Sequence, residues 1–142
     1  MKKSLIFFLC LIVFAACNKD KQAVKQLDGT WEAESVFLKV EFGEFKGSVD
    51  LLQLDSTASA TFEFNECKMK NDNYCNGSLR LVQVDSTIAD DFLFKVVDDG
   101  TTIETLVDGD KNEISLDELS KTDCTLHWIR DTLDLTFYLK KV

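Results

Sequence analysis

Histidine, cysteine and paired carboxylates are the residues through which this chain could do chemistry, and few of them are suitably placed. His127 is the only histidine, and it alternates with Leu126 and Trp128, so it is expected on the solvent side of a strand. The adjacent carboxylates Asp90-Asp91 and Asp98-Asp99 are expected in turns, which favour aspartate for backbone reasons. No serine or cysteine has a base and an orienting partner in its sequence context. We therefore predict no catalytic residue and no enzymatic activity.

The cysteines offer redox or metal chemistry. Cys67 and Cys75 in "FNECKMKNDNYCNG" are close enough to form a disulfide in an oxidising compartment. In the chain-entropy model, so small a loop stabilises the fold by roughly 2–3 kcal/mol. Metal ligation is the alternative, but no second Cys or His pair accompanies them. Cys124 is expected as a buried free thiol, and a reshuffled pairing stays open.

The segment "DGDKNE" (108–113) was compared with a calcium-binding loop. Asp108, Asp110 and Asn112 occupy its first, third and fifth positions. Glu113 stands where the loop needs glycine, and Leu119 stands where it needs glutamate. We therefore predict a hairpin turn here, no metal site and no cofactor.

The charge of the chain excludes one class of partner. Its formal net charge is −9, with 16 Lys and Arg residues against 25 Asp and Glu. No basic stripe is present to neutralise phosphates, so we expect no nucleic-acid binding.

The N-terminus has the pattern of an export signal. Lys2 and Lys3 precede an apolar run over residues 5–14, which is too short to span a bilayer. The sequence "FAAC" that follows resembles the lipobox of bacterial lipoproteins, which implies cleavage before Cys17 and lipidation of its thiol. An ordinary secreted protein, in which Cys17 has no role, is the alternative. Asn18 replaces the aspartate that usually retains such proteins in the inner membrane, which favours the outer membrane. The expected division is a signal peptide (1–16), a lipidated Cys17 with a flexible tether (17–26), and one domain (27–142).

The remainder of the chain alternates apolar and polar residues with a period of two, which is typical of antiparallel strands. The clearest runs are residues 36–42, 61–64, 92–96, 124–129 and 133–140. Turn sequences separate them, such as "NG" at 76–77 and "DDG" at 98–100. Only "SLDELS" (115–120) suggests a helical turn. We therefore predict an all-β fold of about eight antiparallel strands, closed into an up-and-down barrel or packed as a sandwich.

Both ends of this domain resemble a known family. Gly29-x-Trp31 stands at the head of the first predicted strand, and the chain ends in Tyr-Leu-Lys-Lys (138–141). Together these features resemble bacterial lipocalin-like lipoproteins, which implies an eight-stranded up-and-down barrel whose closed end is plugged by Trp31. The arginine that packs over this tryptophan in classical lipocalins is absent, and Lys140 or Lys141 would take its place. The resemblance also implies that a small apolar ligand binds inside the barrel.

A barrel of eight strands is either filled by side chains or holds one small ligand. If a cavity exists, its predicted lining is Val36, Leu38, Phe62, Phe64, Phe92, Phe94 and Phe137. A side-chain-filled barrel would instead indicate a structural or interaction module that meets another envelope protein through segments 68–74 or 98–110. An enclosed apolar cavity of about 300 Å³ or more would favour the ligand.

One modification motif recurs in the chain. Asp followed by Ser or Thr and then by Thr or an aliphatic residue occurs at 55–57, 85–87 and 131–133. This pattern resembles the O-glycosylation sequon that some Gram-negative anaerobes use on exported proteins. The resemblance implies Ser56, Ser86 and Thr132 as acceptors.

Overall fold

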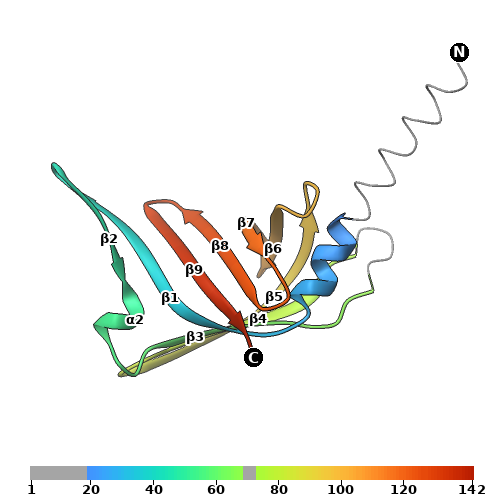
Figure 1. Ribbon diagram of the computed structural model, residues 1–142, viewed down its shortest axis with the longest axis horizontal. Coiled ribbons are helices and arrows are strands. Elements are labelled where there is room, and N and C mark those ends of the chain that lie inside the picture. The colour runs from blue at the N-terminus through green and yellow to red at the C-terminus, as the bar shows by residue number, and fades with distance from the viewer. Residues whose placement is uncertain (1–18, 69–72) are drawn as a thin grey trace, which may run out of the picture.

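The computed structural model describes residues 19–68 and 73–142. Helical residues 19–27 precede nine strands and one further helical turn (Figure 1). These elements are β1 (Gly29–Phe42), β2 (Phe45–Asp50), α2 (Leu51–Leu54), β3 (Ser59–Phe64), β4 (Cys75–Gln83), β5 (Ser86–Val97), β6 (Thr102–Val107), β7 (Asp110–Leu119), β8 (Asp123–Arg130) and β9 (Leu133–Lys141).

The strands form a closed up-and-down barrel. Each of β3 to β9 pairs antiparallel with the next, and β1 pairs with both β3 and β9, which closes a ring of eight strands. The ninth strand, β2, pairs with the outer half of β1, from Phe37 to Phe42, and with no other described strand. The predicted lipocalin-like barrel is therefore confirmed. Closure removes the unpaired edges that an open sheet would expose, except along β2.

The short turns that connect neighbouring strands are formed by residues that tolerate a positive φ. Asp98, Asp99 and Gly100 have φ values of 55°, 59° and 81° between β5 and β6. Asp108 and Gly109, at 51° and 88°, connect β6 to β7. Glycine adopts this region without a steric penalty, and aspartate enters it more readily than most residues. The predicted hairpin turn at 108–113 is confirmed, whereas the predicted helical turn at 115–120 is wrong because residues 115–119 belong to β7.

Alternate strand residues fill the interior. The largest fully buried side chains are Trp31, Phe64, Phe94, Leu27, Ile103, Leu126, Val96 and Cys124. Burial of one large aliphatic or aromatic side chain is worth about 1.5–3 kcal/mol. Several rings also meet edge to face, including Phe64 and Phe94 with centroids 5.0 Å apart.

Helical residues 19–27 close one end of the barrel. Ala23, Val24 and Leu27 are buried there, and the Leu27 carbonyl accepts a 2.7 Å hydrogen bond from Nε1 of Trp31. The Nζ atom of Lys141 lies 5.2 Å from the Trp31 ring centroid, as expected for the missing arginine. The flexible tether predicted for 17–26 is therefore wrong for residues 19–26. Cys17 and Asn18 lie outside the described residues.

Two features of the cysteines are confirmed. Cys67 and Cys75 form a disulfide with a Cα–Cα distance of 5.5 Å, which connects the segment after β3 to the first residue of β4. Cys124 is a buried free thiol, and burial raises its pKa to about 12. This thiol is therefore uncharged and unreactive at neutral pH.

Candidate functional site: a pocket at the mouth of the barrel

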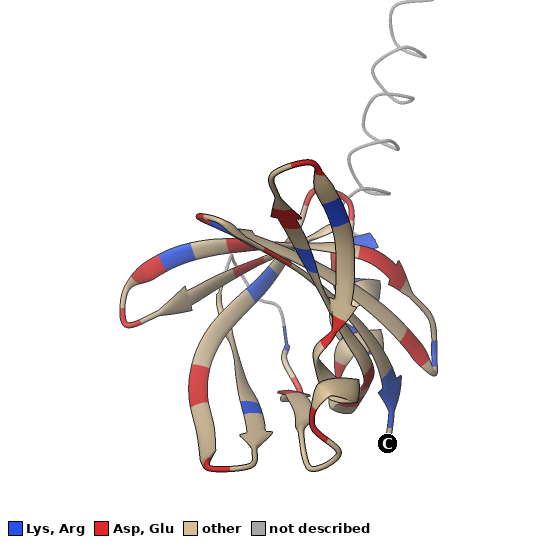
Figure 2. Cartoon of the chain, turned by 90° about the vertical axis from the view of Figure 1, so that its left-hand side faces the viewer, with Lys and Arg blue, Asp and Glu red and all other residues tan. Residues whose placement is uncertain are grey.

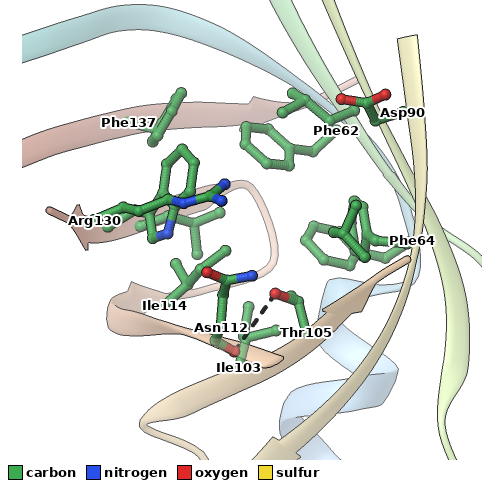
Figure 3. A pocket seen from close by; sticks show the side chains of 14 residues that line it. Phe62, Phe64, Asp90, Ile103, Thr105, Asn112, Ile114, Arg130 and Phe137 are labelled. Atoms are coloured by element: carbon green, nitrogen blue, oxygen red, sulfur yellow. Dashed lines mark hydrogen bonds between the residues drawn. The ribbon is translucent and has the colours of Figure 1, made fainter. Parts of the chain in front are cut away.

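The end of the barrel opposite the helix is open, and we call it the mouth. It is bordered by turns 43–44, 84–85, 108–109 and 131–132 and by residues 51–58. A pocket of about 140 Å³ enters the interior from this end (Figure 3). Its lining is mainly apolar, with Phe62, Phe64, Leu79, Phe92, Ile103, Val107, Ile114, Leu126, Trp128 and Phe137. Four polar residues complete it, namely Asp90, Thr105, Asn112 and Arg130.

Strand register places these side chains on one inner surface. Phe62 pairs with Leu79, and Phe92 pairs with Gly77, so the rings of neighbouring strands point into the same space. Gly77 is required here because a Cβ atom at this position would lie 2.5 Å from Cε2 of Phe92. The absence of a side chain at Gly77 therefore allows the Phe92 ring to form part of the pocket wall.

Two opposite charges lie at the entrance of the pocket. Figure 3 shows the Arg130 guanidinium reaching over the cavity and the Asp90 carboxylate near Phe62. Both residues are exposed. Among the described residues, neither side chain has an ion pair or a hydrogen bond. Arg130 therefore keeps all five of its N–H donors available for an anionic or carbonyl-bearing group.

The other two polar residues lie deeper. The Thr105 hydroxyl lies 3.5 Å from the Asn112 carbonyl oxygen, which is at the limit of a hydrogen bond (Figure 3). Thr105 is buried, whereas Asn112 is half-buried. The side-chain amide of Asn112 lies 3.5 Å from the Asp110 carbonyl, an equally weak contact. These groups are therefore only loosely engaged and can reorient toward an occupant.

The predicted lining is correct in part. Phe62, Phe64, Phe92 and Phe137 line the pocket. Phe94 and Val36 do not line it, and both are buried in the core, where Val36 pairs with Phe137. Leu38 lies farther along β1, paired with Val49 of β2. The inward face was therefore predicted correctly, but the depth of each residue along the barrel was not.

The polar residues of the pocket are not predicted from the sequence. Asp90 and Asp91 were expected in a turn, and this is wrong because both belong to β5, where Asp90 pairs with Leu79. Arg130 continues the inward alternation of Leu126 and Trp128 by one further step. That alternation was the available signal for Arg130.

The volume of the pocket limits its occupant. About 140 Å³ is less than the 300–1,000 Å³ of typical sites for drug-sized ligands. It is close to the volume of an engineered apolar cavity of about 150 Å³ that binds benzene in another protein. The pocket therefore fits one aromatic ring or a short aliphatic group, and the rest of the interior is filled by side chains.

His127 lies outside this pocket, as its alternation predicts. Its Nε2 atom is 2.7 Å from Oδ1 of Asp134, and both side chains are about 30 % exposed on the outer wall. Within residues 19–68 and 73–142 no group of three or more His, Cys, Asp or Glu residues could hold a metal ion.

A buried carboxylate on the outer wall serves the fold. Glu104 is 6 % exposed, and it contacts Lys111 at 2.6 Å, Lys95 at 3.3 Å and the hydroxyl of Tyr74. The hydrogen bonds from Lys111 and Tyr74 lower its pKa to about 2. Because Tyr74 directly precedes Cys75, this cluster fastens the disulfide segment to β6.

The three candidate glycosylation sites are accessible. Ser56 and Thr132 are exposed residues of turns, and Ser86 is the exposed first residue of β5. All three lie at the mouth end. Their modification stays a prediction.

Comparison with protein-family models gives no match for this chain, and comparison with curated protein sequences gives none either. In the part of the chain that the structure describes, no helix has the length and apolar character needed to cross a bilayer.

Proposed function

We propose that this protein is a non-enzymatic binding module of the cell envelope, anchored by lipid on Cys17 to the outer membrane, whose mouth pocket takes a small apolar group. The observation that carries the binding role is the apolar pocket of about 140 Å³ with Arg130 at its entrance, whose guanidinium forms no ion pair with any described residue. Apolar walls supply affinity through burial, and a few polar groups orient the ligand.

The proposed ligand is one ring or a short aliphatic chain, with a carbonyl or carboxylate oxygen that meets Arg130. A bidentate contact from a guanidinium to a carboxylate is stronger than a neutral hydrogen bond. Asp90 at the same entrance disfavours a ligand with several negative charges.

Pocket filling tests this proposal. Ile114→Phe places a larger side chain in the pocket, whereas Ile129→Phe makes the same change on a residue that is 61 % exposed and does not line it. Benzoate and indole are suitable probes, titrated by calorimetry and by the fluorescence of Trp128 in the pocket wall. We expect binding to wild type and to Ile129→Phe and at least about tenfold weaker binding to Ile114→Phe. Equal binding by all three proteins would contradict the proposal.

A second candidate function is an interaction module that binds no small molecule. The small volume of the mouth pocket favours this second function, because side chains fill the rest of the interior and leave space for a single ring only. Native mass spectrometry of the detergent-extracted protein separates the two functions. A co-purifying molecule supports ligand binding, and a bound protein with no small molecule supports the interaction module.

The anchor is tested separately. Intact-mass measurement of the native protein should show cleavage before Cys17 and the added mass of acyl chains, and Cys17→Ala should remove the protein from the outer-membrane fraction. An unmodified Cys17 would contradict the anchor and would leave the pocket proposal unaffected.

A further inference from the structure

Many of the large exposed apolar side chains in the part of the chain that the structure describes lie at or near the mouth. Among the described residues, Phe42 is 83 % exposed, Leu54 72 %, Val84 68 %, Phe45 63 % and Ile129 61 %. The first four lie in or directly beside the turns and the α2 segment that border the mouth, and Ile129 lies on the outer wall two residues before the 131–132 turn. Scattered single apolar residues are normal on a surface, but a concentration at one end indicates a binding face.

The hairpin of β1 and β2 forms the largest part of this surface. It projects beyond the ring of eight strands (Figure 1). Phe42 and Phe45 are cross-strand partners at its tip. Phe42 continues the inward-facing alternation of Val36, Leu38 and Val40, and Phe45 lies opposite it on the same face. The apolar inner face of the barrel therefore extends onto a hairpin whose two rings are mostly exposed among the described residues.

β2 also offers an unpaired backbone edge. It is the terminal strand in the pairing order, and among the described strands it pairs only with β1. Its six residues include no proline, which would weaken strand addition. An extended peptide can therefore hydrogen-bond along β2 and place alternate side chains over the apolar face.

The charge of the mouth selects the partner. Each turn or loop at this end contains an acidic residue, namely Glu44, Asp55, Asp85, Asp108 and Asp131. None of the residues 43–44, 55–58, 84–85, 108–109 and 131–132 is Lys or Arg, and the basic residues near these turns, Lys46, Lys111 and Arg130, belong to the adjoining strands. Figure 2, which looks toward the projecting hairpins, shows acidic residues at their tips. A second copy of this acidic surface would be repelled, and so would an anionic lipid surface.

We propose that the mouth docks an extended segment of a partner protein in which apolar and basic residues alternate. The segment adds as a strand to the free edge of β2, and the apolar side chains on one of its faces cover Phe42 and Phe45. Because successive residues of a strand point to opposite faces, its Lys or Arg residues lie on the other face. There the negative charge of the acidic turns attracts them over a distance of about a Debye length. This inference goes beyond the small-ligand role, because neither phenylalanine lines the pocket.

Synthetic peptides test the proposal on the mature chain carrying Cys17→Ala, which keeps every described residue. The probe is Lys-Phe-Lys-Val-Lys-Phe-Lys. One control replaces each lysine by glutamate, and a second groups the same residues as Lys-Lys-Lys-Lys-Phe-Val-Phe. We expect at least about tenfold tighter binding of the alternating basic peptide than of either control. Equal binding of the three peptides, or no binding of the basic one, would overturn the proposal.

Two protein variants locate the binding. Phe42→Ser/Phe45→Ser should weaken peptide binding about tenfold or more, since exposed aromatic anchors dominate such interfaces. Leu93→Ser/Val142→Ser removes two exposed apolar side chains that lie away from the mouth, and it should leave peptide binding unchanged. Both double variants should keep the indole binding of wild type, so failure of the pocket proposal remains distinguishable.

Amide hydrogen exchange gives the mode of binding. The peptide should slow exchange in β2, residues 45–50, more than in any other strand. Protection confined to another strand would overturn the edge-addition mode. Vesicles of zwitterionic lipid serve as the competing occupant, and vesicle binding that requires Phe42 and Phe45 in the absence of peptide binding would assign the face to a membrane instead.

Discussion

Trp31 and Gly77 show how single residues shape the interior of the barrel. Trp31 is fully buried and is held at the closed end by Leu27 and Lys141. Gly77 makes room for the Phe92 ring beside the pocket. The G-x-W pattern made the role of Trp31 predictable, whereas no local pattern in the sequence marks Gly77 as a packing glycine.

Gly77→Ala should destabilise the protein by about 1–3 kcal/mol, because the new methyl group overlaps Phe92 and also lies 3.0 Å from the Glu63 carbonyl. Gly47→Ala is the matched control, since its Cβ would meet only the ring of Phe45, an exposed side chain that can move. Urea denaturation measures the free energy of unfolding of both variants. Equal stability of the two variants would show that the Phe92 ring moves aside without cost.

Glu104 should affect stability at low pH. Its pKa is lowered to about 2 in the folded state, so its stabilising contribution is complete above the unfolded value near 4.5. The contribution is lost as the pH falls from that value through about 2. Glu104→Gln should therefore reduce the loss of stability between these pH values, relative to wild type. Glu32→Gln, at an exposed position, should retain the wild-type slope in acid denaturation followed by circular dichroism.

At the scale of elements, the helical residues 19–27 are the main departure from expectation. The sequence "KDKQAVKQL" is mostly polar, so it reads as a tether. Ala23, Val24 and Leu27 nevertheless share one helical face, which becomes stable only against the end of the barrel. The Asp20 carboxylate accepts a 2.6 Å hydrogen bond from Gly100 N, which further fixes the helix to the β5–β6 turn.

Leu27→Ala should cost about 2–5 kcal/mol, because it removes a fully buried side chain between the helix and Trp31. Lys25→Ala changes an exposed position of the same helix and should have little effect. Thermal denaturation followed by Trp fluorescence measures the difference. If the two variants were equally stable, residues 19–27 would not be an integral part of the fold.

The disulfide is the second element-scale determinant. Cys67→Ser/Cys75→Ser should lower the free energy of unfolding by roughly 2–3 kcal/mol in the chain-entropy model, because the unfolded chain gains freedom. The spacing of the two cysteines made this bond predictable. Chemical denaturation with and without reductant measures the effect in wild type. Reductant should not change the free energy of unfolding of the double variant.

For the whole molecule, the position of the helix predicts which end of the barrel would face a membrane if Cys17 carries the proposed lipid. Lys19 lies beside Gly100 at the closed end, since a Cβ on Gly100 would be 3.3 Å from its carbonyl oxygen. Two residues of chain reach at most about 7 Å, so a lipid on Cys17 would hold the closed end near the bilayer. The mouth would then face away from the membrane, where a partner protein can reach it.

A fluorescent label tests this orientation in the lipidated protein reconstituted into vesicles. A label on Lys121→Cys, in the closed-end turn, should be quenched by headgroup quenchers more strongly than one on Glu44→Cys at the tip of the β1–β2 hairpin. Both positions are exposed, so the labels should not disturb the core. The opposite order of quenching would place the mouth against the bilayer and would contradict the docking proposal.

The sequence by itself predicted the antiparallel strands, the Cys67–Cys75 disulfide and the inward faces of most strands, because alternation, cysteine spacing and turn residues act over a few neighbouring positions. Alternation alone left a barrel and a sandwich open, and the barrel was expected from the resemblance of the two ends of the domain to lipocalin-like lipoproteins. The sequence did not determine which inward residues form the pocket. A period of two gives the face of a residue, but its depth depends on the register between strands far apart in the chain. Only the tertiary structure therefore placed Phe94 and Val36 in the core, Asp90 and Arg130 at the entrance, and Phe42 and Phe45 on a hairpin beyond the barrel.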